Sequence, residues 1–252
     1  MSGQSKGGGA EIMSKSLLVL GAGSDLASKV IEKEIFNYDQ ILAQYYKSEQ
    51  RIKELQERFG EKIVPIQADF SNMESTEKFV EQLKQYKDIE GILHLAANKI
   101  KYNKIHKIEW EVVQEEINVQ LRSIWLIINQ VMGNMIKRKS GRIVFVLSSC
   151  TVNVPPRFLG SYTCCKYALL GLMKGLAAEY AEKGILVNAV SPGMMNTKFL
   201  EYIPEFVKED TMNKNPLKRL TNAEDVLPVI ELLLGEANTF ITGQNIVISG
   251  GE

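Results

Sequence analysis

The sequence has little cysteine and no excess of charge of either sign. Its three cysteines, Cys150, Cys164 and Cys165, form an odd set without the spacing of a disulfide framework, which is typical of a reducing compartment. No second Cys or His pair accompanies the adjacent Cys164 and Cys165, so we expect no metal site. The chain carries 30 basic and 30 acidic residues, and this balance gives no reason to expect a nucleic acid or an anionic membrane as a partner.

Long hydrophobic runs are also absent. The longest, such as 124–128 and 232–234, have the length of core segments and fall short of a transmembrane helix, so we expect a cytoplasmic protein. Residues 1–12 are rich in glycine and serine and lack an apolar stretch, which argues against a signal peptide and indicates a flexible tail, either a linker or a remnant of an expression vector. With 252 residues, 45% of them apolar, the chain can bury a large core, and we expect a single domain over 13–252.

Strand-like and helix-like segments alternate along the chain. Short apolar runs predict strands at 17–20, 40–45, 62–67, 91–95, 142–147, 186–190 and 245–248. Apolar residues three and four apart predict helices at 26–36, 49–59, 76–86, 110–138, 162–182 and 225–234. Because strands that alternate with helices form βαβ units, the sequence predicts an α/β fold with a doubly wound parallel sheet of about seven strands, covered by helices on both faces.

A glycine-rich turn follows the first predicted strand. Gly21 and Gly23 let the backbone turn sharply and approach a pyrophosphate, and the helix after them offers free N–H groups and the positive end of its dipole. The later positions of this dinucleotide-binding pattern hold Asp25 and Ala27 instead of glycine. A carboxylate at Asp25 repels phosphate unless it points away, and an ordinary turn with Asp25 as the helix N-cap is the alternative interpretation.

Tyr162 and Lys166 lie four residues apart in a predicted helix and therefore share one face. A free tyrosine has a pKa of about 10 and is a slow acid or base at neutral pH. An ammonium group beside it favours the phenolate and lowers that pKa toward the working range. Such a pair can donate a proton to a carbonyl oxygen or remove one from an alcohol, although a solvated helix face produces the same spacing.

Three further polar residues are candidates for the same site. Ser148 and Ser149 end the fifth predicted strand, at the carboxyl edge where ligands bind in open α/β sheets, and a hydroxyl there can orient a substrate carbonyl. Asn118 lies inside the predicted helix 110–138, where an asparagine is mildly unfavourable unless its side chain has a partner. The unfavourable position of Asn118 indicates a role for its side chain. Serines at the end of a strand are common, so Ser148 and Ser149 are weaker evidence of function.

From residue 16 to the C-terminus the chain resembles the short-chain dehydrogenase/reductase family, because these pieces follow one another in the family's order. The order is Gly21 and Gly23, Asp69 after the third strand, Ala96 and Ala97 after the fourth, Asn118, Ser148 and Ser149, Tyr162 with Lys166, the segment 187–193 with Thr197, and the segment 242–251. The resemblance implies a Rossmann-type fold and an NAD(P)-dependent oxidoreductase that reduces a ketone to a secondary alcohol, or the reverse, by hydride transfer.

The family's mechanism implies a role for each candidate. Tyr162 would be the general acid in carbonyl reduction, and Lys166 would lower its pKa and bind the nicotinamide ribose. Asn118 would fix a water that links Lys166 to solvent. A serine would hold the substrate carbonyl. The family's serine precedes the tyrosine by about 13 positions, which favours Ser149, whereas counting from the start of the strand favours Ser148 as the alternate; we expect Ser149.

The resemblance also implies which residues hold the cofactor. Asp69 would touch the adenine, and the loop from Pro192 to Thr197 would hold the nicotinamide. The expected set is Gly21, Gly23, Ser24, Asp25, Leu26, Tyr46, Lys47, Asp69, Phe70, Ala96, Ala97, Tyr162, Lys166, Pro192, Gly193, Met195 and Thr197.

The end of the second predicted strand favours NADP(H) over NAD(H) as the cofactor. A NAD-preferring member would carry an acidic residue about where Tyr45 stands, to hold both ribose hydroxyls. No acid is present there, and Lys47 and Ser48 can meet a 2′-phosphate, although Lys47 is equally compatible with a solvated surface charge. His94 stands where the family has an asparagine, and we expect a buried structural histidine rather than a catalytic base.

The substrate and the assembly are less constrained. The segment 198–220 is rich in apolar residues and is expected to form either a mobile lid over a partly apolar substrate or a helical hairpin on the core. A 3-oxoacyl thioester or a secondary-metabolite ketone fits a family member of this size. The predicted helices 110–138 and 162–182 resemble the family's dimer-forming pair, and the second carries small residues at 168, 171, 175 and 178, so we expect a homodimer or homotetramer.

Two other functions are open at this point. A dinucleotide-binding regulatory protein without turnover would explain the incomplete glycine pattern, but Tyr162, Lys166 and Asn118 argue against it. An enzyme of the sugar-nucleotide epimerase or dehydratase branch would need a longer C-terminal substrate-binding part than the 55 residues after Thr197.

Overall fold

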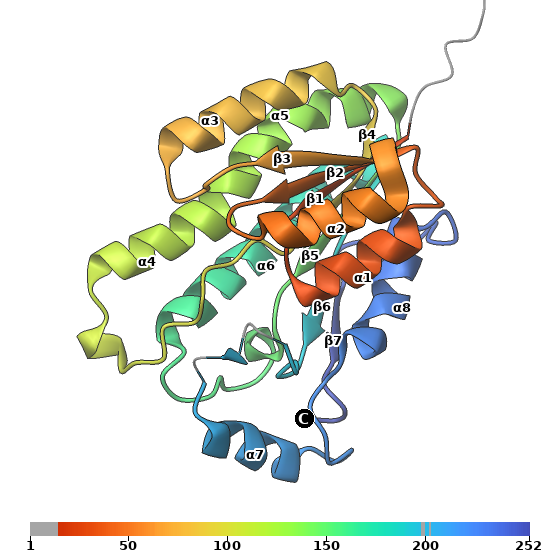
Figure 1. Ribbon diagram of the computed structural model, residues 1–252. Coiled ribbons are helices and arrows are strands. Elements are labelled where there is room, and N and C mark those ends of the chain that lie inside the picture. Colours follow the sequence, from red (N-terminus) through yellow and green to blue (C-terminus); the bar gives the residue numbers. More distant parts are fainter. Residues whose placement is uncertain (1–14, 198–199, 202) are drawn as a thin grey trace, which may run out of the picture.

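The computed structural model describes residues 15–197, 200–201 and 203–252 (Figure 1). The tail predicted at 1–12 lies outside the described residues. Seven parallel strands form one sheet in the order β3-β2-β1-β4-β5-β6-β7. Their bounds are β1 Ser16–Leu20, β2 Gln40–Tyr45, β3 Ile63–Gln67, β4 Ile89–His94, β5 Gly141–Val146, β6 Ile185–Pro192 and β7 Asn245–Ile248. The predicted doubly wound α/β fold is confirmed.

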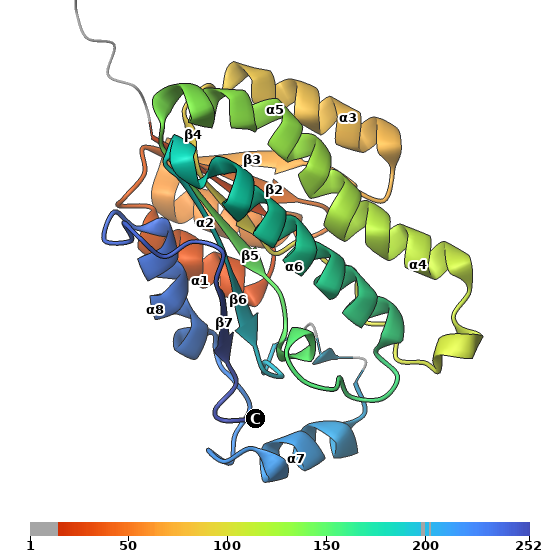
Figure 2. The same ribbon diagram turned by 180° about the vertical axis from the view of Figure 1, so that it is seen from behind.

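Helices cover both faces of the sheet, as Figures 1 and 2 show from opposite sides. Helices α1 (Asp25–Glu34), α2 (Glu49–Phe59) and α8 (Ala223–Leu234) cover one face. Helices α3 (Met73–Gln82), α4 (Trp110–Ile117), α5 (Ser123–Arg138) and α6 (Gly160–Tyr180) cover the other. Because successive strand residues point to opposite faces, Leu17 and Val19 pack in the first layer while Leu18 and Leu20 pack in the second.

Two predicted segments differ from the structure. The helix predicted at 110–138 is divided into α4 and α5 by a π-helical turn at Asn118–Arg122, a feature that is frequent at functional sites. Within the segment 198–220, the described residues contain helix α7 (Glu205–Lys214), which has no buried residue and lies at the carboxyl end of the sheet, apart from the helical layers (Figure 1).

The sheet order reverses direction at β1. The chain moves from β1 to β2 and β3 on one side and then crosses to β4 on the other, so that the connections after β1 and β4 diverge. In parallel sheets such a reversal leaves a crevice at the carboxyl ends of the strands, where ligands bind. In the part of the chain that the structure describes, no helix combines the length and the apolar character needed to cross a membrane.

Candidate active site

The glycine turn between β1 and α1 forms one end of the site. Gly21 has a φ of +86°, in the region that favours glycine, and a Cβ there would lie 2.9 Å from the backbone nitrogen of Ala96. A Cβ at Gly23 would overlap the side chain of Ser48. Both positions therefore require glycine, and the turn is held close against the segments that follow β2 and β4.

Gln44 fixes this turn from below and was not a sequence candidate. Its buried side chain accepts a hydrogen bond from the Gly21 N–H at 2.9 Å and donates one to the Ala68 carbonyl at 2.9 Å. The amide thereby ties the end of β1 to the end of β3. The signal in the sequence is a polar residue next to the buried apolar run of β2, where an unpaired amide would be costly.

Asp25 is not the N-cap of α1, contrary to the alternative that the sequence left open. Ser24 caps the helix, since its side chain accepts the Ala27 N–H at 3.1 Å. Asp25 is the first helical residue and pairs with Arg51 of α2, with Nη1 and Oδ1 2.7 Å apart. Arg51 also donates to the Gly23 carbonyl at 3.1 Å. An arginine therefore offsets the carboxylate beside the glycine turn.

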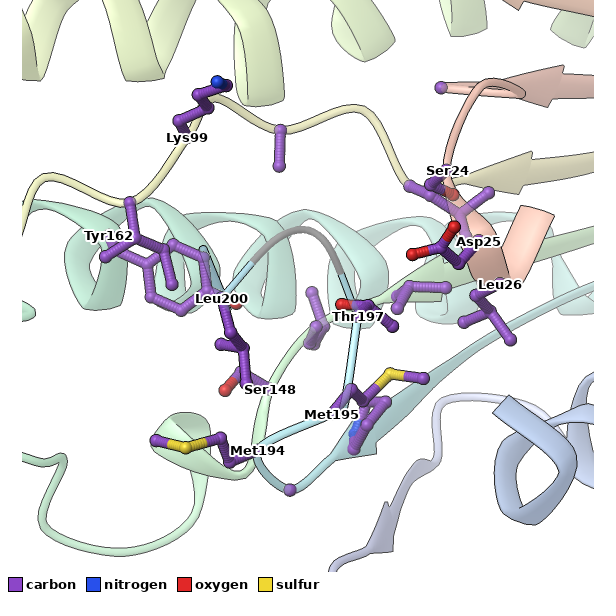
Figure 3. A pocket seen from close by; sticks show the side chains of 18 of the residues that line it. Ser24, Asp25, Leu26, Lys99, Ser148, Tyr162, Met194, Met195, Thr197 and Leu200 are labelled. Carbon is purple, nitrogen blue, oxygen red and sulfur yellow. The ribbon is translucent and has the colours of Figure 1, made fainter. Parts of the chain in front are cut away.

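A cavity of about 670 Å³ extends from this turn to Tyr162 (Figure 3). Its volume is in the range of small-molecule and cofactor sites. Most of the residues expected to hold a cofactor line it. They are Gly21, Gly23, Ser24, Asp25, Leu26, Ala97, Tyr162, Lys166, Pro192, Gly193, Met195 and Thr197.

The other expected cofactor residues lie outside the cavity lining and fall into two groups. Tyr46, Lys47 and Asp69 gather where β2 and β3 end. Although desolvation opposes the shift, hydrogen bonds from Ser71 and Tyr46 and the charge of Lys47 lower the pKa of Asp69 below its usual value. Phe70 and Ala96 are buried, and Phe70 packs edge-on against Phe79 in the core, so the Phe70 side chain does not reach the cavity.

Tyr162 and Lys166 both line the cavity, with the Lys166 ammonium nitrogen 5.5 Å from the centre of the Tyr162 ring. Lys166 donates to the Val146 carbonyl at 3.0 Å, and its burial lowers its pKa to about 8. The sequence predicted that Lys166 would lower the pKa of Tyr162. In the structure, burial instead raises the pKa of Tyr162 above its usual value, because desolvation of the phenolate outweighs the favourable hydrogen bond from Ser148.

The structure favours Ser148 over the expected Ser149 as the serine beside Tyr162. Ser148 lowers the pKa of the Tyr162 phenol against the effect of burial, and Figure 3 shows the two side chains on the same part of the cavity wall. Ser149 also lines the cavity, but it begins a 3-10 turn, Ser149–Thr151, in which Ser148 is the N-cap. The regular alternation of strand β5 has ended at this point, so counting along the strand or back from Tyr162 does not determine which serine faces inward.

The role expected of Asn118, to fix a water beside Lys166, stays a prediction. The Asn118 side chain is half-buried, accepts a hydrogen bond from Gln114 at 3.1 Å and is absent from the cavity lining. The buried amide of this region is Gln120, which is 0% exposed and contacts His94 through its backbone carbonyl. A signal for Gln120 exists in the sequence: it lies four residues before Ile124, which begins the apolar face of α5.

His94 is buried, as expected, and among the described residues one of its two ring nitrogens has a hydrogen-bond partner. Nε2 lies 2.8 Å from the carbonyl oxygen of Gln120 and therefore carries the proton. Burial and the nearby Lys166 lower the pKa of His94 to about 3, so the ring is neutral at physiological pH. The buried, neutral state of His94 is explained without a role as a catalytic base or a metal ligand.

The end of the cavity beyond Tyr162 was not predicted in detail. It is lined mainly by apolar side chains, with one cationic residue, Lys99, at its rim (Figure 3). The apolar group comprises Ile100, Cys150, Pro156, Leu159, Met194 and Leu200. Among the described residues, no group of three or more His, Cys, Asp or Glu is placed to hold a metal ion.

The residues present fit a dinucleotide. The glycine turn leaves no room for a Cβ, and the capped N-terminus of α1 faces the cavity. Lys166 lies at the opposite end, where it donates to the Val146 carbonyl. Gly21, Gly23 and Ser24 would hold the pyrophosphate. Lys166, together with Pro192 and Thr197, would hold the nicotinamide riboside.

Comparisons with known proteins agree with this geometry. The family model described as enoyl-(acyl carrier protein) reductase matches residues 39–252. The uncharacterized oxidoreductase YmfI of Bacillus subtilis is 28% identical over 95% of this chain and 99% of its own length. A 3-oxoacyl-[acyl-carrier-protein] reductase FabG of Buchnera aphidicola is 28% identical over 92% of both chains. The solved structure of ElxO with NADP bound has 26% identity and a TM-score of 0.83, covering 95% of this chain and 98% of its own.

Arg51 is predicted to offset the repulsion between Asp25 and a pyrophosphate. Asp25→Asn leaves an uncompensated arginine and should tighten NADPH binding about fivefold. Arg51→Gln leaves an uncompensated carboxylate and should weaken NADPH binding by a similar factor. The size of both effects follows from the contribution of partly exposed ion pairs, which is up to about 1 kcal/mol. The double variant should return close to the wild-type dissociation constant, measured by fluorescence titration. Equal weakening in both single variants would show that the pair acts only by holding the turn.

Proposed function

Because this chain belongs to the short-chain dehydrogenase/reductase family, we propose that it uses NADPH to reduce a ketone to a secondary alcohol. The observation that carries this proposal is that Tyr162, Ser148 and buried Lys166 line one cavity, which is continuous with the glycine turn. Three groups are thus gathered where a carbonyl and a nicotinamide would meet. They are the acid Tyr162, the Ser148 hydroxyl, which can bind the carbonyl oxygen, and the cation Lys166.

Each residue has a defined task in this reaction. When bound, the nicotinamide supplies the hydride to the carbonyl carbon. Ser148 donates a hydrogen bond to the carbonyl oxygen and orients it beside the Tyr162 hydroxyl. Tyr162 donates its proton to that oxygen as negative charge develops there. Lys166 holds the ribose and stabilises the tyrosinate that remains.

The state of Tyr162 supports reduction as the favoured direction. Its raised pKa keeps the phenol protonated at neutral pH, which is the form that donates a proton to a developing alkoxide. Oxidation of an alcohol needs the phenolate instead. A pKa raised by burial makes that form scarce until the pH rises well above neutrality, so reduction is expected to be faster at pH 7 and oxidation to gain with increasing pH.

NADPH is proposed as the cofactor because of the residues at the end of β2. Tyr46 and Lys47 lie together, with the Lys47 nitrogen 4.7 Å from the centre of the Tyr46 ring, and Ser48 borders the glycine turn. No acidic side chain follows β2 before Glu49 to repel a 2′-phosphate. ElxO, with 26% identity over nearly its whole length, was solved with NADP bound.

The apolar end of the cavity supports a substrate with an apolar part next to its carbonyl. Figure 3 shows Leu200 beside Tyr162 and Met194 next to Ser148, and Ile100, Cys150 and Leu159 complete the surface. The FabG relatives are named 3-oxoacyl-[acyl-carrier-protein] reductases. A 3-oxoacyl thioester or a secondary-metabolite ketone is the proposed class of substrate.

Tyr162→Phe is predicted to abolish ketone reduction, by at least about a hundredfold in kcat, because the proton donor is lost. NADPH should still bind, as measured by fluorescence titration. Ser148→Ala should lower kcat/KM far more than Ser149→Ala, which serves as its matched control. Near-normal turnover in Tyr162→Phe would contradict the mechanism, and a wild-type protein that binds NADPH but reduces none of a panel of ketones would favour a regulatory role.

Lys47 is predicted to recognise the 2′-phosphate. Wild-type protein should bind NADPH more tightly than NADH, and Lys47→Gln should weaken NADPH binding several-fold while leaving NADH binding unchanged, because only NADPH carries the extra phosphate. Lys53→Gln, an exposed lysine of α2 paired with Glu49, is the control for a general loss of positive charge. An equal effect on both cofactors would overturn the role given to Lys47.

Self-association through α5 and α6 is proposed as well. These helices lie side by side on one face (Figure 2), where Trp125 and Tyr167 are exposed and the small residues at 168, 171, 175 and 178 leave α6 open to close approach. Wild-type protein is predicted to sediment as a dimer or tetramer, and Gly171→Arg to shift it toward the monomer. A wild-type monomer at micromolar concentration would contradict the proposal.

A further inference from the structure

Three polar side chains form a closed group next to the serine turn, the segment 148–151 that follows β5. Thr151 ends this turn, Ser191 lies near the end of β6, and Asn245 begins β7. Thr151 and Ser191 are buried and Asn245 is partly buried, where β6 and β7 pair side by side (Figure 2). We call this group the polar bridge. None of its three members lines the cavity, and the reaction proposed above gives them no task.

Ser191 stands in a row of otherwise apolar residues. Because side chains alternate along a strand, Val187, Ala189 and Ser191 point to the same face of β6. Val187 and Ala189 are fully buried in the core that α6 covers. A hydroxyl in the same row loses its hydration, which is costly unless the protein supplies a hydrogen-bond partner. The serine at this position therefore depends on the partners that the polar bridge gives it.

The hydrogen bonds of the polar bridge run in one direction. The Ser191 hydroxyl donates to Oδ1 of Asn245 at 2.7 Å, and Nδ2 of Asn245 donates to Oγ1 of Thr151 at 3.1 Å. The Thr151 hydroxyl donates to the Ser148 carbonyl oxygen at 2.8 Å. The hydroxyl oxygens of Thr151 and Ser191 are also 3.2 Å apart, but each hydroxyl has one proton, and the two shorter bonds use both protons. The direction is therefore from β6 through β7 to the serine turn.

Thr151 holds the carbonyl of Ser148 twice. Its backbone N–H donates to that oxygen at 2.9 Å, in addition to its hydroxyl at 2.8 Å. The paired part of β5 has ended just before this point, where the Leu147 N–H donates to the Val190 carbonyl at 2.8 Å. The polar bridge thus takes over from the backbone pairing of the sheet in fixing the serine turn to β6.

The other end of the polar bridge leads to the loop that is expected to hold the nicotinamide. Ser191 is followed directly by Pro192 and Gly193, which begin that loop and line the cavity. The Gly193 N–H donates to the Ile248 carbonyl at 2.9 Å, so β7, which carries Asn245, also supports the start of the loop. The polar bridge therefore links the serine turn to the two strands that support this loop.

We propose that the three residues of the polar bridge are positioning residues, which hold Ser148 at a fixed place relative to the loop from Pro192 to Thr197. This inference rests on the proposed ketone reduction, in which Ser148 binds the substrate carbonyl and the loop holds the nicotinamide. The polar bridge thereby sets how closely the carbonyl carbon and the transferred hydrogen approach each other. Its effect on the reaction passes through Ser148.

Hydride transfer is sensitive to such placement. Reacting atoms have to approach to about 3–3.5 Å, and a misplacement of about 1 Å can cost about a hundredfold in rate. The Ser148 hydroxyl lies on the cavity wall (Figure 3), and its oxygen accepts the Cys150 N–H at 3.3 Å. A hydroxyl that accepts in this way keeps its own proton for donation to a carbonyl oxygen. A shift of the serine turn would therefore move the group that orients the substrate.

The first test measures the polar bridge without turnover, by urea unfolding. Thr151→Val removes the hydroxyl but keeps the shape of the side chain, and Asn245→Leu removes the amide. Because the two side chains share a hydrogen bond, the double variant should lose clearly less unfolding free energy than the sum of the two single losses.

Thr76→Val is the matched control for this test. Thr76 is also buried, and its hydroxyl donates to a backbone carbonyl, that of Asn72 at 2.8 Å, in α3 on the far side of the core. Its effect should add to that of Asn245→Leu, because the two residues share no partner. Additive losses for Thr151→Val and Asn245→Leu would overturn the polar bridge.

The second test measures turnover of a ketone with NADPH. Thr151→Val should lower kcat about tenfold, because the carbonyl is placed less well, while the NADPH dissociation constant stays within about twofold. The primary deuterium isotope effect on kcat, measured with NADPH labelled at the transferred hydrogen, should rise because hydride transfer becomes slower relative to the other steps. Thr151→Ser keeps the hydroxyl and should restore most of kcat. Ser191→Ala, the mildest change, should act in the direction of Thr151→Val.

The decisive measurement is Thr151→Val in the Ser148→Ala background. If Thr151 acts by holding Ser148, the substitution should change kcat by less than about twofold there. A loss as large as that in the wild-type background, or an unchanged isotope effect in Thr151→Val alone, would overturn the proposal. A wild-type protein that binds NADPH but reduces no ketone would overturn the proposed function instead, and the unfolding measurements would still decide whether the polar bridge joins the serine turn to β7.

Discussion

The chemistry of the site depends on how one buried ammonium group is held. Lys166 is 3% exposed, and the removal of a charged amine from water is costly unless other groups compensate. Its hydrogen bond to the Val146 carbonyl fixes it at the end of β5, and the Glu116 carboxyl offsets part of the desolvation. The result is a lysine with a pKa of about 8, close enough to neutrality to exchange a proton and still carry charge at pH 7.

The doubly wound sheet explains why this lysine meets the glycine turn. Tyr162 and Lys166 begin α6, Ser148 follows β5, and Gly21 follows β1, so residues more than a hundred positions apart share the carboxyl edge of one sheet. Parallel order brings every strand–helix connection to that edge. The predicted bounds of β2, α2 and β7 agree with the structure to the residue, because apolar runs with clear ends, such as the stop at Gly60, specify them locally.

Side-chain placement was harder to predict than the elements. Spacing along the chain suggested Ser149 and Asn118, whereas the structure places Ser148 on the cavity wall with Tyr162 and buries the amide of Gln120 instead of that of Asn118. Which serine faces the cavity depends on where the alternation of side chains along β5 gives way to a turn. The spacing between a serine and Tyr162 contains no information about that point. Whether the amide of Asn118 or that of Gln120 is buried depends on which side of the helix faces the core. Extending the apolar face of α5 back by whole turns from Ile124 reaches Gln120 and Glu116, so helix register would have been the better guide.

Asp25 and Glu116 both carry a carboxyl group, and their different surroundings affect its charge differently. Asp25 lies where phosphate would bind, and Arg51 offsets its charge directly across a 2.7 Å ion pair. Glu116 lies in the interior, where the Ser161 hydroxyl donates a hydrogen bond to it at 3.1 Å and the charges of Glu115, Lys101 and Lys166 act on it. A carboxylate in a close ion pair with arginine stays ionised, because arginine does not lose its proton at physiological pH. Burial raises the pKa of Glu116 above its usual value, because desolvation disfavours the carboxylate. Asp25 is therefore suited to a fixed electrostatic role, whereas desolvation acts against the charge of Glu116.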